Sequence, residues 1–298
     1  MKGYKTIAIL TVLTTLLVSC TKEINVNIPD AETKVVVQGV IENGEHPYVI
    51  LTRSASYFAP IQEWLDSIFI LDATVIISDG STTDTAMMEV DNNVMAPLPY
   101  FVYRSHAITG EVGKTYSLKV IALGKTITAS TTIPNPVPLD SLWFEIDPGS
   151  HSDSLGFVWA RLNDPPELGN YYAWFSKVLG QDARFLAPGG YTFDDKFFNG
   201  QSIPFPYQRP RDPVNPPPDD PNAPPSWYFI TGDTVAIKFC TMDYYHYEYL
   251  DRLEALQDGG DNPFGTPAVL PTNLSDGALG YWGGFACTYD TVVCIPQP

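Results

Sequence analysis

The sequence predicts a mainly β fold, in which an N-terminal immunoglobulin-like β-sandwich is followed by a second β-rich domain with one helix and a long proline-rich insert. Strand-like apolar runs recur at short intervals with turn residues between them. One segment near the C-terminus has helical periodicity, and a proline-rich stretch divides the strands into two groups. A length of 298 residues suits two domains of this kind.

Residues 1–19 have the pattern of a secretory signal peptide. Lys2 and Lys5 precede an apolar run over residues 7–18, which is too short for a membrane-crossing helix of about 20 residues. The run ends in "LVSC", which resembles the lipobox of bacterial lipoproteins, where the cysteine is acylated after the preceding peptide is removed. We therefore expect Cys20 to carry a lipid anchor and residues 20–33 to form a lipidated tether. The alternative is a buried cysteine in an ordinary secretory peptide.

The chain is strongly acidic. Its net charge is −17, and removal of residues 1–19, which contain Lys2 and Lys5, makes the charge −19. Phosphate backbones repel such a protein, so nucleic acid is excluded as a partner. Lys22 and Glu23 follow Cys20 and resemble a surface-export signal of Bacteroidota lipoproteins, which favours a surface-exposed location on the outer membrane.

Residues 34–134 are expected to form the immunoglobulin-like sandwich. The apolar runs here are "KVVVQGVI", "HPYVILTRSA", "DATVIISDG", "PYFVYRS", "KTYSLKVIA" and "KTITASTTIP". Tyr116, Leu118 and Val120 alternate with polar residues, which is the period of a half-buried strand. "GKTYSLKV" also looks like a tyrosine-corner strand, in which the phenol ties a crossing loop to the sheet. The alternative for Tyr116 is one more apolar strand residue.

Residues 135–141 form the expected linker, because the prolines of "IPNPVPLDS" stiffen the backbone and interrupt strand pairing. Residues 142–298 form the second domain, with the strand-like runs "SLWFEID", "LGFVWARLND", "YYAWFSKVL" and "DTVAIKFCTM". The insert at residues 204–225 holds 10 prolines in 22 residues. This density argues against a regular strand ladder through the insert.

One helix is predicted over residues 241–260. Met242, Tyr245, Tyr249, Leu253 and Leu256 recur there at helical spacing and form an apolar stripe. Thr241 or Asp243 is expected to cap the start, and two glycines end the segment. The stripe predicts that the helix packs on the second sheet.

Three cysteines remain after Cys20. In an oxidising compartment a disulfide is their expected use. Cys287 and Cys294 flank "TYDTVV", a length that a hairpin or tight loop closes, and we predict that these two pair. Cys240 lies in an apolar strand pattern, where it is either a buried free thiol or the partner of one of the other two.

The chain resembles the Bacteroidota outer-membrane lipoprotein family called domain of unknown function 4249 over nearly its whole mature length. The matching segments are the lipobox cysteine, "VVVQGVI", "DATVIISDG", "GKTYSLKV", "IPNPVPLDS", "LNDPPELGNYY", "FDDKFFNG", "VAIKFCTMD", "NPFGTP" and "TNLSDGALGYWGGF". The resemblance implies an immunoglobulin-like N-terminal domain, a second β-rich domain and an outer-membrane address, often with a TonB-dependent transporter of the SusC type encoded nearby. It implies no reaction. The longer proline insert and the two C-terminal cysteines depart from the family pattern.

The sequence predicts no catalytic residue, metal site or cofactor, and we expect that the protein is not an enzyme. The histidines lack metal-ligand spacing and accompany no G-x-S-x-G motif; they are His46, His106, His151 and His246. The acidic clusters, Asp194-Asp195, Asp219-Asp220 and Glu63 with Asp66, are interpreted as solvated loop charge rather than as a glycosidase pair.

Aromatic residues are the best candidates for contact with a partner or ligand. We select Tyr57, Phe58 and Trp64, in a loop between strands, and Trp227 and Tyr228, where the insert ends. Rings with one polar edge suit sugars, peptides and protein interfaces. Local packing is the alternative for each.

Three functions follow from these observations. The first is a non-enzymatic lipoprotein that is held in outer-membrane lipid by acylated Cys20 and assists a TonB-dependent transporter in nutrient uptake. The second is a stand-alone glycan- or peptide-binding surface module. The third and least favoured is a hydrolase.

Overall fold

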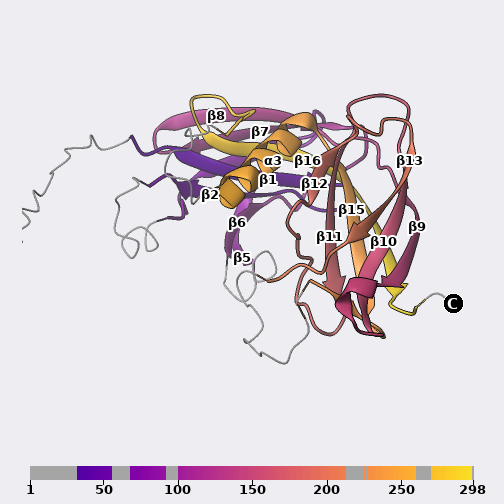
Figure 1. Cartoon of the computed structure of the whole chain (residues 1–298). Helices are drawn as coiled ribbons and strands as arrows, with labels where there is room; N and C mark the ends of the chain where they lie inside the picture. The colour runs from indigo at the N-terminus through magenta and orange to yellow at the C-terminus, as the bar shows by residue number, and fades with distance from the viewer. Residues whose placement is uncertain are drawn as a thin grey trace, which may run out of the picture. The chain divides into compact units, whose positions relative to one another are not determined.

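The computed structural model of the chain describes residues 32–55, 68–91, 100–212, 225, 227–259 and 270–296. These residues form a mainly β structure, as the sequence predicts (Figure 1). Every apolar run identified above as a strand contains one. The positions of Cys20, Tyr57, Phe58 and Trp64 lie outside the described residues.

An eight-stranded sheet contains strands from both halves of the chain. Its order is β12-β11-β15-β16-β1-β2-β6-β5. The strands are β1 Val35–Glu42, β2 Tyr48–Arg53, β5 Met87–Asp91, β6 Tyr100–Arg104, β11 Tyr171–Val178, β12 Thr192–Asp194, β15 Thr234–Met242 and β16 Leu279–Val293. The two halves meet where β1 and β16 pair in parallel.

Two four-stranded sheets complete the β structure of the described residues. The first has the order β4-β3-β7-β8 and contains β3 Thr74–Ser78, β4 Thr83–Thr85, β7 Thr115–Ala122 and β8 Lys125–Thr132. The second contains β9 Leu139–Ile146, β10 Leu155–Asn163, β13 Ser202–Tyr207 and β14 Phe229–Ile230, with a short 3-10 helix, η1, at Pro148–Ser150. In this sheet β10 pairs with β9, β13 and β14.

Each four-stranded sheet has its own hydrophobic core. Side chains of β3, β7 and β8 pack with those of β1 and β2, and Trp282 of β16 is fully buried in the same cluster. A second cluster joins β9, β10 and β13 to β11 and β15. Alternating buried and exposed positions along β7 show how the sequence produces this packing, because successive side chains of a strand face opposite sides.

The predicted division into two domains at residues 135–141 needs correction. Residues 33–298 form one compact unit, and the eight-stranded sheet runs through both predicted domains. Strand β9 already begins at Leu139, inside the expected linker. The structure does not confirm an immunoglobulin-type sandwich in the first half, because the sheet that faces β3 and β7 continues into the second half.

The proline-rich insert contains a strand that the sequence argued against. Strand β13 includes Pro204 and Pro206, and it pairs antiparallel with β10. It lies at the edge of its sheet, where one side of the strand needs no donors. Because the two prolines occupy alternate positions, their missing N–H groups lie on the same side of the strand. When this is the unpaired side, the hydrogen bonds between β13 and β10 are unaffected. Most of residues 213–226 lie outside the described residues.

The predicted helix is present as α3, Tyr244–Gly259. Asp243 caps it, since the His246 amide donates to Asp243 Oδ1 at 3.1 Å. Helix α3 packs against β16, β12 and β11 (Figure 1). The predicted stripe is partly wrong, because Tyr245 is exposed and His246 takes a buried position. In the described part of the chain, no helix has the length and apolar character needed to cross a membrane.

The cysteine pairing differs from the prediction. Cys240 and Cys287 form the disulfide, and Cys294 is a buried free thiol. Cys240 and Cys287 face each other directly across the antiparallel strands β15 and β16, whereas Cys294 lies beyond the end of β16. With a sequence separation of 47 between the two cysteines, chain-entropy arguments give the cross-link a contribution of about 4 kcal/mol.

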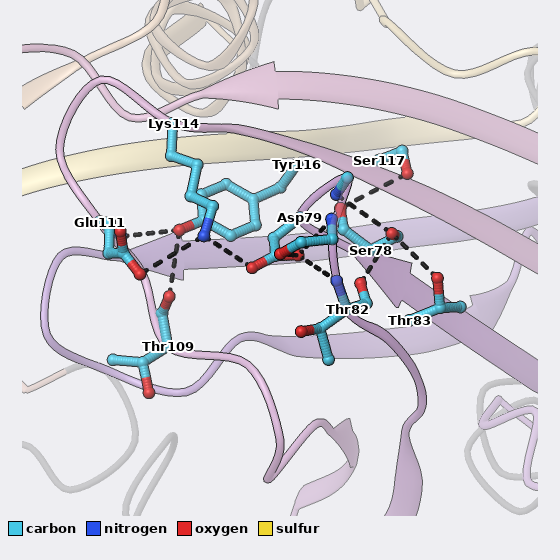
Figure 2. Close-up of polar contacts among 11 residues, drawn as sticks. Ser78, Asp79, Thr82, Thr83, Thr109, Glu111, Lys114, Tyr116 and Ser117 are labelled. Carbon is cyan, nitrogen blue, oxygen red and sulfur yellow. Dashed lines mark hydrogen bonds and ion pairs between the residues drawn. The ribbon is translucent and has the colours of Figure 1, made fainter.

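The expected tyrosine corner is confirmed at Tyr116. This fully buried residue donates from its phenol to the Thr109 carbonyl at 3.0 Å and accepts from the Glu111 amide at 2.7 Å (Figure 2). Beside it, Lys114 Nζ donates to Asp79 Oδ2 at 2.7 Å and lowers the pKa of that carboxyl. These contacts tie the loop before β7 to the turn after β3.

Replacing Tyr116 with Phe tests the importance of this corner. The ring stays, but the Glu111 amide and the Thr109 carbonyl lose their common partner in a part-buried position, so we expect the free energy of unfolding to fall by about 1 to 3 kcal/mol. Urea unfolding measures the change. Tyr245→Phe, at an exposed phenol, is the matched control and should leave stability unchanged. Equal stability of the two variants would contradict the structural role of the phenol.

Candidate functional site

A cavity of about 530 Å³ lies on the face of the eight-stranded sheet that α3 covers, and we call it the central cavity. Its walls come from β1, β2, β5 and β6 of the first half and from β11, β15, β16 and α3 of the second half. Tyr281, Phe285 and Tyr289 occupy every fourth position of β16 and contribute to the lining. Residues at even spacing share one face of a strand, which explains this arrangement.

Strand register brings the other lining residues beside them. Lys238 of β15 pairs with Tyr289 of β16 on one side and with Phe175 of β11 on the other. Beyond β16 and β1, toward the other edge of the sheet, Tyr48 of β2 pairs with Arg104 of β6. The cavity therefore collects residues that are far apart in the sequence.

Two groups of ionic contacts connect residues in the walls of the cavity. Lys238 Nζ donates to Glu42 Oε2, and the Tyr289 phenol donates to the other oxygen of Glu42. Arg104 Nε donates to Glu89 at 2.5 Å, and its Nη2 donates to Asp91. These side chains are largely buried, so each charge has a partner where solvation is poor.

The cations also lie over aromatic rings. Arg104 lies 5.2 Å from the centre of the Tyr48 ring, and Lys238 lies 5.6 Å from that of Tyr289. Both distances are within the range of a cation–π attraction. Each cation is thus held by a carboxylate and by a ring at the same time.

Three phenols contribute uncharged polar groups. Tyr48, Tyr191 and Tyr281 line the cavity, and among the described residues their hydroxyls have no hydrogen-bond partner. Burial raises the pKa of Tyr48 to about 12, and it raises the pKa values of Tyr191 and Tyr281 well above the usual value of 10. The phenols of Tyr48 and Tyr191 lie close enough to Tyr281 to add to its shift. All three are therefore neutral at physiological pH and can donate or accept.

His246 forms the floor below these phenols. Its side chain is 1% exposed, and neither ring nitrogen has a partner in the described structure. The imidazole stacks on Tyr281 at 4.4 Å and contacts Phe285 at 4.3 Å between ring centres. Gly283 lies directly beneath, because a Cβ atom there would come within 2.2 Å of His246 Nδ1. Burial lowers the pKa of His246 to about 4.

Buried aspartates outside the central cavity stabilise the fold. Asp195 accepts from the Gly169 and Asn170 amides at 2.9 and 3.0 Å, and Asp164 accepts from the Tyr172 phenol at 2.5 Å. These carboxylates hold turns and strand ends. Within the described ranges, His, Cys, Asp and Glu form no group that could hold a metal ion.

The described aromatic residues selected from the sequence do not line the central cavity. Trp227 is 47% exposed. Tyr228 is buried, and its phenol donates to Asp147 Oδ2 at 2.5 Å, while its ring packs on Phe157 at 5.0 Å. Local packing, the alternative considered above, therefore describes Tyr228. The cysteines of the disulfide also lie outside the lining.

Sequence reasoning missed the residues of the cavity. The spacing of Tyr281, Phe285 and Tyr289 was a usable signal, because three aromatic residues on one face of a strand indicate a common surface. Glu42 and Lys238 carried no such signal. They meet through the pairing of β16 with both β1 and β15, which strand patterns do not reveal.

The buried imidazole predicts an acid-sensitive fold. Because the unfolded chain protonates this histidine near pH 6.5 and the folded chain only near pH 4, stability should rise with pH across this window. Acidification from pH 7 to 4 should remove up to about 3 kcal/mol through His246. We expect His246→Phe to flatten the pH dependence of urea unfolding, whereas His151→Gln, at an exposed histidine, should keep it. An unchanged slope in His246→Phe would contradict this assignment.

A family model described as Domain of unknown function (DUF4249) matches residues 21–290. No curated protein matches the chain. The matched range includes all the strands that line the central cavity except the end of β16.

Proposed function

We propose, from the premise that the chain belongs to the DUF4249 family, that it is a lipid-anchored binding protein of the outer membrane that holds a ligand in the central cavity. The observation that carries the proposal is the cavity itself, with half-buried aromatic rings, paired charges and unpartnered phenols on one sheet face. Ligand sites of proteins typically combine an apolar concave surface with a few placed polar groups.

The arrangement of charge supports binding without turnover. Glu42 already accepts from Lys238 and Tyr289, and Asp91 already accepts from Arg104. A general acid or base needs a proton that it can exchange with a substrate, and carboxylates held in ion pairs are poor at this. We therefore propose a non-enzymatic role.

The sequence supports the membrane address and the partner. The lipobox-like "LVSC" supports acylation of Cys20, and the acidic tether that follows suits exposure at the cell surface. We propose that the protein delivers its ligand to a TonB-dependent transporter of the SusC type. A stand-alone surface module is the second candidate, because the same cavity works without a transporter.

The anchor is tested with Cys20→Ser in the full-length chain. We expect the wild-type protein to incorporate radiolabelled palmitate and to fractionate with the outer membrane, because several acyl chains give lasting attachment. The variant should lose the label and leave that fraction. Thr21→Ser is the control and should behave as wild type. Membrane fractionation and labelling of the Cys20→Ser variant would rule out the lipid anchor.

A pull-down separates the two roles. Tagged wild-type protein, cross-linked in its host and solubilised mildly, should recover a β-barrel transporter that mass spectrometry identifies. Recovery of the tagged protein without any barrel would exclude the transporter and leave the stand-alone module.

A further inference from the structure

We propose that the central cavity binds an uncharged saccharide, through hydrogen bonds from the phenols and packing of the sugar ring on aromatic side chains. The inference rests on the proposed function, since it takes this cavity as the ligand site. It adds the chemical class of the ligand.

The charges of the cavity argue against an anionic ligand. Glu42, Glu45 and Asp91 outnumber Lys238 and Arg104 in the lining, and both cations already have carboxylate partners. A phosphate, sulfate or carboxylate would have to compete with these ion pairs in a protein of net charge −17. It would also take the cation away from a largely buried carboxylate, which is costly.

An organic cation is disfavoured for a different reason. Such ligands bind where aromatic faces and carboxylates are open to them. Here Arg104 lies over Tyr48 and Lys238 lies over Tyr289 and Phe175, so the protein's own cations use these faces. Their partners are Glu42 and Asp91, the two carboxylates of the lining that are largely buried, whereas the third acid, Glu45, is exposed to solvent.

The groups that remain open are neutral. The hydroxyls of Tyr48, Tyr191 and Tyr281 have no partner in the described part of the chain, and each can donate one hydrogen bond and accept others. Partly buried polar groups of this kind gain most from a ligand that supplies both donors and acceptors. Sugar hydroxyls do so without bringing charge.

Aromatic surfaces flank these phenols. Phe175 packs beside Tyr191 at 5.6 Å, and Phe185 packs beside Tyr289 at 5.8 Å between ring centres. Phe185 and Tyr191, over which no cation of the described residues lies, are half-buried, so part of each ring stays accessible. The C–H face of a sugar ring is apolar and fits such a surface, while its hydroxyls point to the edges.

The size and rigidity of the cavity fit this class. Its volume of about 530 Å³ lies within the range of about 300 to 1,000 Å³ that is typical of small-molecule sites. His246 is a positioning residue, because it stacks under Tyr281 and holds that ring against the sheet. A preformed site loses less entropy when it binds.

The test uses full-length protein, purified in an amine-oxide detergent so that no sugar headgroup competes. The probes are an array of neutral oligosaccharides, together with sulfated and amino-substituted oligosaccharides of matched length. We expect binding to neutral members and weaker binding to both charged sets. Isothermal titration with the best neutral oligosaccharide then gives the dissociation constant.

Two variants connect binding to the cavity. Tyr48→Phe and Tyr281→Phe keep the rings and remove one hydroxyl each, so each should weaken binding by about three- to tenfold. Tyr245→Phe, at an exposed phenol of α3 outside the central cavity, is the matched control and should bind as wild type. Circular dichroism checks that all variants are folded.

Several outcomes would overturn the inference. These are no binding to any neutral oligosaccharide, tighter binding to a charged set, or wild-type affinity in both phenol variants. None of them affects the palmitate label or the transporter pull-down, so failure here is distinguishable from failure of the proposed function.

Discussion

The parallel pairing of β1 with β16 brings the first and last strands of the described chain together inside one sheet. Trp282 of β16 then fills the core of the first half and donates from its indole to the Tyr116 carbonyl of β7 at 3.1 Å. Two glycines permit the close approach. A Cβ atom at Gly39 would meet the Trp282 ring at 2.5 Å, and Gly280, at φ +99°, lies against the Val37 backbone. Without β16, the first half would therefore lack part of its hydrophobic core.

The same pairing creates the central cavity. Glu42 and Lys238 are 196 residues apart, and Glu42 and Tyr289 are 247 apart, yet they form one ionic cluster across the junction of the two halves. Helix α3 covers this junction and supplies His246, which stacks on residues of β16. The phenols of Tyr48 and Tyr281 likewise come from opposite halves. A ligand in the cavity would contact both halves at once, and the rigidity of the sheet would hold its binding groups in place.

Local patterns predicted local structure well. The alternation in β7 identified that strand and its inward face, and the spacing around Tyr116 identified a phenol that ties a loop. The prolines of the insert were a weaker guide, because β13 tolerates them at a sheet edge. The helix was expected, but its buried face was shifted, since Asp243 starts α3 in a position that turns His246 inward.

Long-range pairing was beyond these patterns. Cys287 lies close to Cys294 in sequence, but the register of β15 and β16 puts Cys240 opposite it. Exposed aromatic residues were sought in loops, whereas the cavity uses half-buried rings on strands such as Phe175. Both errors have one physical cause: strand order across the sheet depends on contacts between residues that no local period relates.

Hydrogen exchange of the full chain in increasing urea tests the shared sheet most directly. Mass spectrometry of peptides from β7 and β15 reports the two halves separately within one sample. If β16 makes them one cooperative unit, both peptides should lose protection at the same urea concentration. Two separate midpoints would show that the halves unfold independently and would contradict the account.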